Sequence, residues 1–149
     1  MKTVESKKPR IVLFQCQYCL ASSMDQAWVE NDLPANVKLI KVPCSGRIDP
    51  LYILNAVQGG ADGIMVCGCD PHKCHYKEGN LHARRALSEF RNFLDMLGYP
   101  SDRFVFHWMG INEHSLIQPL LSDFENKLMD ADLEKHLDTR QVDVDQEYF

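Results

Sequence analysis

Four short apolar runs occur along the chain, and each is rich in β-branched or aromatic residues, as is typical of buried strands. The segments between them carry apolar residues at three- and four-residue spacing, which is the pattern of an amphipathic helix. Strands that alternate with helices predict a parallel sheet covered on both faces and joined by right-handed crossovers. The runs are IVLFQ from Ile11, VKLIKV from Val37, GIMVCG from Gly63 and RFVFHWMG from Arg103.

Two of the predicted helices have well-marked ends. One begins with Asp49 as its N-cap and Pro50 in the first helical position, and it stops at Gly59. The next runs from about residue 80 to residue 97, and Gly98 closes it. The apolar face of this longer helix consists of Leu87, Phe90, Leu94 and Leu97.

Two further helices are predicted, one after Cys19 and one after Gly110, and Pro119 indicates that the latter begins late. The residues that support them are Met24, Ala27 and Trp28 for the first and Leu116, Leu120, Leu121, Phe124 and Leu128 for the last. The predicted fold is therefore an α/β protein with an open, parallel, four-stranded sheet, helices on both faces and flavodoxin-like strand order.

Chain length and composition predict one domain. The 149 residues, 45% hydrophobic and 25% charged, are enough to bury a single core. We place the domain at residues 1–129, because apolar periodicity fades from Asp130 onward. Residues 130–149 form an acidic C-terminal extension, which is either a disordered tail or an arm that becomes ordered on a partner.

The formal net charge of -5 argues against nucleic-acid binding, which requires a clustered basic surface. The basic N-terminus lacks a following apolar segment, and no run of about 18 apolar residues indicates a membrane span. We therefore expect a cytoplasmic protein. In that compartment thiols stay reduced, so the six cysteines are expected to be metal ligands or redox groups before structural disulfides.

Five cysteines lie where the predicted strands end. Cys16 and Cys19 follow the first strand, Cys44 follows the second, Cys69 ends the third and Cys74 lies in the loop beyond it. The carboxyl ends of parallel strands meet at one edge of a sheet, where ligands bind, so these thiols are expected to converge. Soft thiolates select zinc, copper(I) or iron-sulfur clusters. Four of them complete either a tetrahedral zinc site or a 2Fe-2S centre, and the ligand count does not choose between these two.

Two other interpretations of the cysteines remain open. The Cys16-Gln-Tyr-Cys19 pair after a first strand also fits a dithiol oxidoreductase, although this leaves the other thiols unexplained. His72 and His75 flank Cys74 and keep a zinc-stabilised binding module possible, but we expect both to be exposed or outside the ligand shell.

The sixth cysteine, Cys67, differs because the alternation of residues along its strand places it inside the core. Three glycines are expected either to make turns or to let backbone approach the centre and donate N–H groups to sulfur, namely Gly46, Gly68 and Gly79. Basic residues are concentrated in the segment after Cys69, namely Lys73, Lys77, Arg84 and Arg85. This group is either a solvated helix face or a docking site for an acidic partner.

The strings CQYC, VPCSGRIDP, GADGIMVCGC and CHYKEGNLHARR occur here in a characteristic order and spacing. Together they resemble the delta subunit of methyl-viologen-reducing hydrogenase, over roughly residues 9 to 129. The combination of CSGR with GC-x4-CHY is the most specific part of this likeness. The chain departs from the expected pattern at Cys67, where the family is expected to have a small residue.

The resemblance implies a 2Fe-2S protein that carries electrons from a hydrogenase or formate dehydrogenase to the flavin subunit of heterodisulfide reductase, within an electron-bifurcating complex. It implies cluster ligands among Cys16, Cys19, Cys44, Cys69 and Cys74, with one of the five lying close by as a non-ligand. No carboxylate falls in a recognisable catalytic pattern with these cysteines, so catalysis is expected to reside in the partners.

Overall fold

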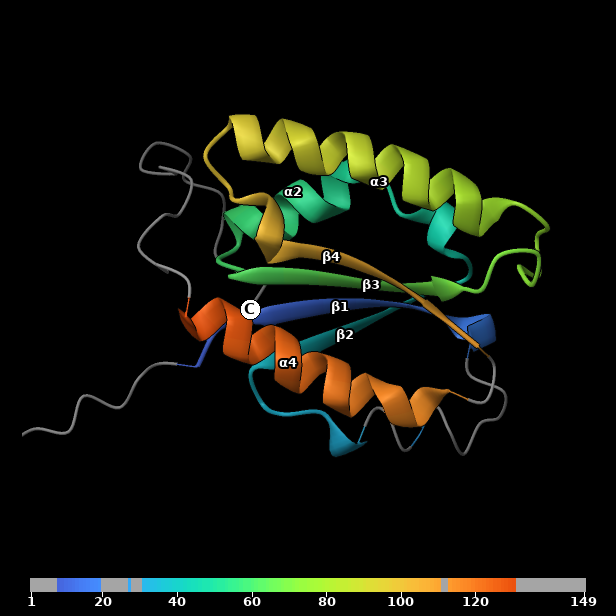
Figure 1. Cartoon of the computed structure of the whole chain (residues 1–149), viewed down its shortest axis with the longest axis horizontal. Helices are drawn as coiled ribbons and strands as arrows, with labels where there is room; N and C mark the ends of the chain where they lie inside the picture. Colours follow the sequence, from blue (N-terminus) through green and yellow to red (C-terminus); the bar gives the residue numbers. More distant parts are fainter. Residues whose placement is uncertain (1–7, 20–26, 28–30, 111–112, 131–149) are drawn as a thin grey trace, which may run out of the picture.

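The structure is a computed structural model that describes residues 8–19, 27, 31–110 and 113–130 (Figure 1). Its four strands are β1 (Ile11–Cys16), β2 (Val37–Val42), β3 (Gly63–Cys69) and β4 (Phe104–Met109). They form one parallel sheet in the order β2-β1-β3-β4. The predicted α/β fold and its flavodoxin-like order, in which the chain reverses direction across the sheet between β1 and β3, are confirmed.

Helices cover both faces of the sheet. The two helices α2 (Pro50–Gln58) and α3 (Gly79–Met96) lie on one face, and α4 (Ile117–Asp130) lies on the other (Figure 1). None of the helices in the described part of the chain is long and apolar enough to cross a membrane.

Alternation along the central strands divides the core into two clusters. On β1, Val12 and Phe14 face α2 and α3, whereas Ile11 and Leu13 face α4. All six residues of β1 and all seven of β3 are buried, as expected for inner strands covered on both sides. The apolar core thus fixes the register of β1 against β3, since a one-residue slip would exchange their faces.

The predicted ends of α2 are confirmed. The Asp49 side chain accepts a hydrogen bond from Leu51 N at 2.8 Å, Pro50 is the first helical residue, and Gly59 caps the carboxyl end. In α4, which begins at Ile117, Pro119 falls in the first turn, where a missing N–H leaves no intrahelical bond unmade.

One prediction about α3 is wrong, since Leu97 does not belong to its buried face and is 47% exposed. The helix ends one residue earlier because Gly98, at φ +93°, turns the backbone into the left-handed region. Gly98 N donates to Asp95 O at 3.1 Å and Tyr99 N to Leu94 O at 2.9 Å, which is the Schellman arrangement.

Two predicted segments cannot be compared with the structure. The helix expected after Cys19 lies mostly within residues 20–30, and the acidic extension was predicted for residues 130–149. Apart from residue 27 and Asp130, the last residue of α4, both lie outside the described residues.

The packing of α4 on β3 predicts a cost for any side chain at Gly63. A Cβ there would stand 2.5 Å from Leu128 Cδ1 and 2.8 Å from Phe124 Cε1, and both side chains are buried. We expect Gly63→Ala to lower the free energy of unfolding by about 1–3 kcal/mol, measured by urea denaturation. In a double-mutant cycle, Leu128→Ala should reduce that cost. An unchanged midpoint for Gly63→Ala alone would contradict this close packing.

Candidate functional site

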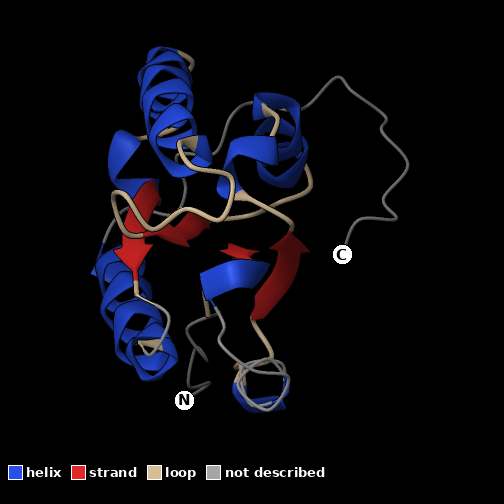
Figure 2. Ribbon diagram, turned by 90° about the vertical axis from the view of Figure 1, so that its right-hand side faces the viewer, coloured by secondary structure: helices blue, strands red, loops and turns tan. Residues whose placement is uncertain are grey.

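Two cysteines mark the position where the strand order reverses at the carboxyl edge of the sheet. Cys16 is the last residue of β1 and Cys69 the last residue of β3, and their Sγ atoms lie 3.7 Å apart. Both side chains are buried. Figure 2 looks onto the molecule from this edge. This is the crevice where open α/β sheets bind their ligands.

A second pair of thiols lies beside the first. Cys44 follows β2, Cys74 lies in the loop after β3, and their Sγ atoms are 3.8 Å apart. Cys74 packs against Cys16 and Cys69, so the four thiols form one group. A tetrahedral ion bound by thiolates at about 2.3 Å holds two of them about 3.8 Å apart. Each pair therefore has the sulfur spacing of two ligands on one metal ion.

The fifth predicted thiol, Cys19, is the last residue of the short 3-10 helix Gln17–Cys19, and its side chain lies outside the described residues. Within the described part of the chain, no group of three or more His, Cys, Asp or Glu side chains is placed to hold a single metal ion. The described thiols are thus arranged two by two.

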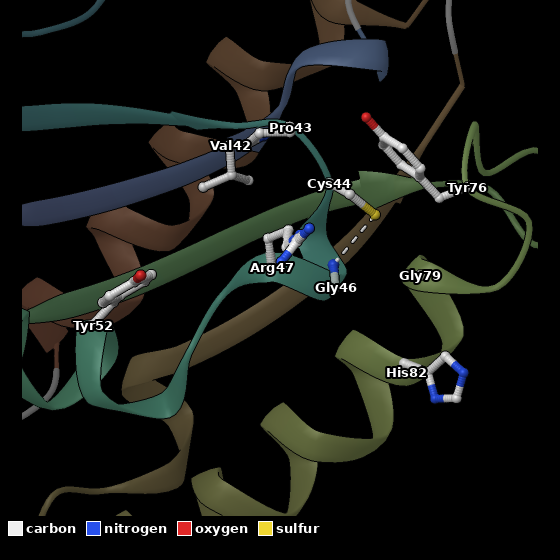
Figure 3. A pocket seen from close by; sticks show the side chains of 9 residues that line it. All are labelled: Val42, Pro43, Cys44, Gly46, Arg47, Tyr52, Tyr76, Gly79 and His82. Carbon is white, nitrogen blue, oxygen red and sulfur yellow. Dashed lines mark hydrogen bonds between the residues drawn. The ribbon is translucent and has the colours of Figure 1, made fainter.

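Two glycines create the space around Cys44. A Cβ at Gly79 would run into Cys44 Sγ and would lie 3.4 Å from Cys74 Sγ. A Cβ at Gly46 would stand 2.8 Å from Gly79 O, so neither position has room for a side chain. Gly46 N also donates to Cys44 Sγ at 3.4 Å (Figure 3). The expected close approach of backbone to sulfur is confirmed at these two glycines.

Burial and the Gly46 hydrogen bond shift the pKa of the Cys44 thiol in opposite directions. Burial raises the pKa of Cys44 above its ordinary value, the Gly46 N–H lowers it, and the adjacent Cys74 and Cys16 thiols raise it further. The 18-residue helix α3 begins at Gly79, against the same sulfur, so the positive end of its dipole favours a thiolate there.

Cys67 lies in the core, as predicted. It is 0% exposed and packs with Ile11, Leu13 and Met65 in the cluster beneath α4. Burial raises the pKa of this thiol to about 12. A thiol so far from ionisation is neither a nucleophile nor a metal ligand at neutral pH.

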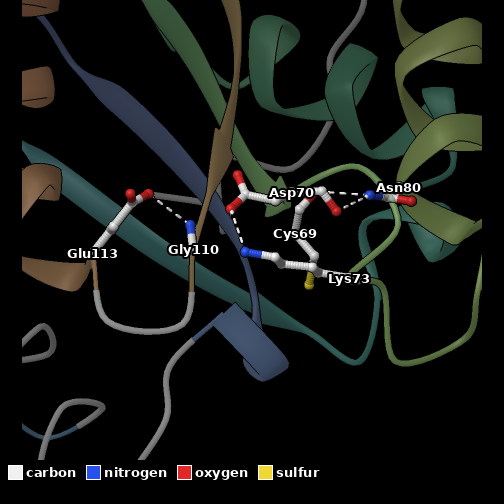
Figure 4. A network of polar contacts seen from close by, with 6 residues as sticks. All are labelled: Cys69, Asp70, Lys73, Asn80, Gly110 and Glu113. Atoms are coloured by element: carbon white, nitrogen blue, oxygen red, sulfur yellow. Dashed lines mark hydrogen bonds and ion pairs between the residues drawn. The ribbon is translucent and has the colours of Figure 1, made fainter.

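Asn80 anchors the backbone at the carboxyl end of β3, a role that the sequence alone did not identify. This fully buried amide donates from Nδ2 to Cys69 O and to Asp70 O, both at 2.8 Å (Figure 4). Its Oδ1 accepts from Leu81 N at 2.9 Å, at the start of α3. An asparagine next to a predicted helix start suggests a cap, and the only further signal is its position six residues after Cys74.

Three aromatic side chains join two of the cysteine loops. Tyr18 stacks on His75 with ring centroids 3.8 Å apart, and Tyr76 meets both rings edge-on. His72 and His75 are exposed, which agrees with the expectation that they lie outside the ligand shell. The Cys74 loop also has left-handed backbone at His72 and Lys77, a conformation that L-residues rarely adopt.

The basic residues near the site are all exposed, but two of the four already have partners. Lys73 Nζ lies 3.8 Å from Asp70 Oδ2, and the Arg84 guanidinium lies 4.5 Å from the centroid of the Trp108 ring. Lys77 and Arg85 face solvent. Close to Asp70, Gly110 N donates to Glu113 Oε2 at 2.7 Å (Figure 4).

Comparison with known proteins identifies the family. A model of the family described as "Methyl-viologen-reducing hydrogenase, delta subunit" matches residues 11–131. The chain belongs to this family. The resemblance found in the cysteine motifs is thereby confirmed over most of the chain.

Individual members of this family are similar over nearly their whole length. The iron-sulfur subunit of the F420-non-reducing hydrogenase vhc of Methanococcus voltae is 36% identical over 125 residues, which are 83% of this chain and 87% of the relative. The iron-sulfur subunit of the F420-non-reducing hydrogenase of Archaeoglobus profundus is 35% identical over 122 residues, or 81% and 89% of the two chains.

The same domain also occurs as part of a larger protein. One subunit of the ferredoxin:CoB-CoM heterodisulfide reductase of Methanosarcina mazei is 30% identical over 125 residues. The match covers 83% of this chain but 16% of that protein.

The hydrogen bonds of Asn80 predict a stability effect that an exposed asparagine on the same helix does not share. Asn80→Ala removes the amide donor from Cys69 O and from Asp70 O, which keeps only its bond from Lys73 N, at a cost of about 1–3 kcal/mol. Asn92→Ala, at an exposed position of α3, should change the free energy of unfolding by less than about 0.5 kcal/mol. Urea denaturation of both variants measures the difference, and equal effects would rule out the anchoring role of Asn80.

Proposed function

We propose that the chain is an electron-transfer subunit that holds a 2Fe-2S cluster with ligands drawn from Cys16, Cys19, Cys44, Cys69 and Cys74. It would relay electrons between a hydrogenase or formate dehydrogenase partner and the flavin subunit of a heterodisulfide reductase. The observation that carries this proposal is the pairing of four described thiols, with Sγ–Sγ distances of 3.7 and 3.8 Å. A two-iron cluster requires such an arrangement, because each iron takes two protein ligands.

The residues around the thiols fit such a group. Gly79 has no side chain where one would collide with Cys44 Sγ, and Gly46 supplies an N–H to that sulfur. The buried hydroxyl of Ser45 has no hydrogen-bond partner among the described residues, which leaves one further donor beside Cys44. When bound, the cluster would supply one-electron redox chemistry, and the protein's part is to bury it and to donate hydrogen bonds to its sulfurs.

Cys19 has a defined place in this proposal. Cys16, Cys44, Cys69 and Cys74 suffice for four ligands, so Cys19 would be the nearby thiol that does not ligate the cluster. Its backbone lies three residues beyond Cys16, at the end of the 3-10 helix. The proposal therefore assigns one iron to Cys16 and Cys69 and the other to Cys44 and Cys74.

The partner part of the proposal rests on the relatives. One group of relatives is named as hydrogenase subunits, and another carries the same domain inside a larger protein of a heterodisulfide reductase. A domain that is separate in some proteins and fused to a reductase protein in others is expected to function next to that protein. We infer that this chain assembles with a protein of that kind as part of a hetero-oligomer.

Metal analysis tests the proposal. Protein purified without oxygen should contain about two irons and two acid-labile sulfides per chain and give a paramagnetic resonance signal on reduction. One zinc and no sulfide would instead indicate a structural metal in a binding module. Metal-free protein that is active as a disulfide oxidoreductase would favour the Cys16–Cys19 dithiol.

Two cysteines in the same strand provide a matched pair of variants. Cys69→Ser should remove most of the iron and the visible absorption, because it breaks the Cys16–Cys69 pair. Cys67→Ser should retain both, because Cys67 lies in the core beneath α4. Circular dichroism would show that each variant is folded. Loss of iron from both variants to the same extent would overturn the assignment.

A further inference from the structure

Cys44, one member of the Cys44–Cys74 pair, lines a cleft of about 870 Å³ (Figure 3). The cleft is lined by the end of β2, the 3-10 helix Ser45–Arg47, and the first turns of α2 and α3. Gly46 and Gly79 lie next to the sulfur, so no side chain from these two positions separates Cys44 from the cleft. Of the two thiol pairs, this one therefore borders a large open cavity.

The walls of the cleft are basic and aromatic. Arg47 and His82 line it from opposite sides, and both are exposed. Among the described residues Arg47 forms no ion pair, whereas His82 lies 3.9 Å from Glu78, on its own helix. Tyr52 and Tyr76 line the remaining walls and are 52% and 53% exposed. An unpaired guanidinium beside half-exposed tyrosines is typical of the residues that dominate protein interfaces.

An apolar hollow of about 330 Å³ adjoins the cleft. The two cavities share Val42 and Tyr52, and the hollow continues along Ile40 and Phe14 toward α2. It lies at the edge of the sheet, because β2 is the outermost strand in the order β2-β1-β3-β4. The cleft and the hollow together form one surface, apolar at the sheet edge and basic above Cys44, which we call the Cys44 surface.

We propose that the Cys44 surface is the docking surface for a redox partner protein, whose apolar side chains fill the hollow and whose acidic side chain faces Arg47. Electrons would then cross through the Cys44–Cys74 side of the centre. This inference rests on the proposed function and adds the place and the chemistry of the partner.

Charge and shape favour an acidic protein segment over the alternatives. Complementary charge steers association and fixes orientation, and Arg47 supplies an unpaired positive charge within the cleft. The basic face of α3 is the competing site, but there Arg84 is engaged with the Trp108 ring, and neither Arg84 nor Arg85 lines the cleft or the hollow. Arg85, exposed on α3, is therefore the matched control for Arg47.

Small charged oxidants report where electrons leave the cluster-loaded protein. Cobalt(III) in tris(oxalato)cobaltate, an anion, accepts one electron from the reduced protein and becomes cobalt(II), which leaves the protein oxidised by one electron. Arg47→Glu should slow this reaction about tenfold and accelerate the reaction with the cation hexaamminecobalt(III). Arg85→Glu should change either rate by less than about twofold, and both effects should diminish at high salt.

A second measurement needs no cluster. In metal-free, full-length protein, a thiolate of the Cys44–Cys74 pair attacks the disulfide of dithiobis(nitrobenzoate), a dianion, forms a mixed disulfide and releases thionitrobenzoate. Arg47→Glu should slow this step about tenfold but leave the reaction with neutral dithiodipyridine unchanged. Mass spectrometry would identify the modified cysteine.

These two measurements separate the docking surface from the proposed function. If the purified protein contained no iron but Arg47→Glu still slowed modification of the thiol by the anionic reagent, the cluster would be refuted. The selective approach of anions to Cys44 would be retained. Cluster-loaded protein in which Arg85→Glu has the larger effect, or in which neither variant has any, would overturn the docking surface. If deletion of residues 131–149 abolished the Arg47 effect, the occupant of the surface would be the chain's own tail and not a partner. If the protein formed a dimer that Arg47→Glu dissociates, the occupant would be a second copy of the chain.

Discussion

The pairing of β1 with β3 at the middle of the sheet is the interaction on which the rest of the structure depends. It brings the last residues of the two strands, Cys16 and Cys69, to a sulfur distance of 3.7 Å. Both strands are buried on both faces, so two apolar clusters hold the register that places the thiols together. The free energy that stabilises the core is thus also what preorganises the site.

The second thiol pair depends on contacts of a different kind. Cys44 and Cys74 come from loops, where close approach requires the absence of side chains at Gly46 and Gly79. Backbone–backbone contact between the two loops and the N–H of Gly46 replaces the side-chain packing found in the core. Loops that carry functional groups on a rigid sheet are a common solution in α/β proteins, because the loop conformation can change without altering the fold.

Much of this arrangement follows from the sequence by simple physical arguments. The alternation of apolar strands with amphipathic helices predicted the parallel sheet. The alternation along β3 predicted Cys67 inside the core, and the end of the strand predicted Cys69 at the carboxyl edge. The partition of the thiols into two pairs was beyond prediction, because it depends on the path of the Cys74 loop. That loop contains left-handed backbone at His72 and Lys77, two positions where the chain has neither glycine nor asparagine.

The errors have similarly local causes. Leu97 continued the apolar pattern of α3, but Gly98 ended the helix before the pattern did. Asn80 has the appearance of a helix cap, and its anchoring of Cys69 and Asp70 depends on a tertiary contact between a helix start and a strand end. Side chains that satisfy backbone groups at such junctions are recognisable once the three-dimensional path is known.

The central claim is that two pairs of thiols bind two metal ions that share one centre, and X-ray absorption at the iron edge tests it most directly. On protein purified without oxygen, we predict an all-sulfur first shell with four neighbours for each iron, and a second iron as the next scatterer. A first shell of nitrogen or oxygen, or a metal ion without a second metal nearby, would contradict the claim.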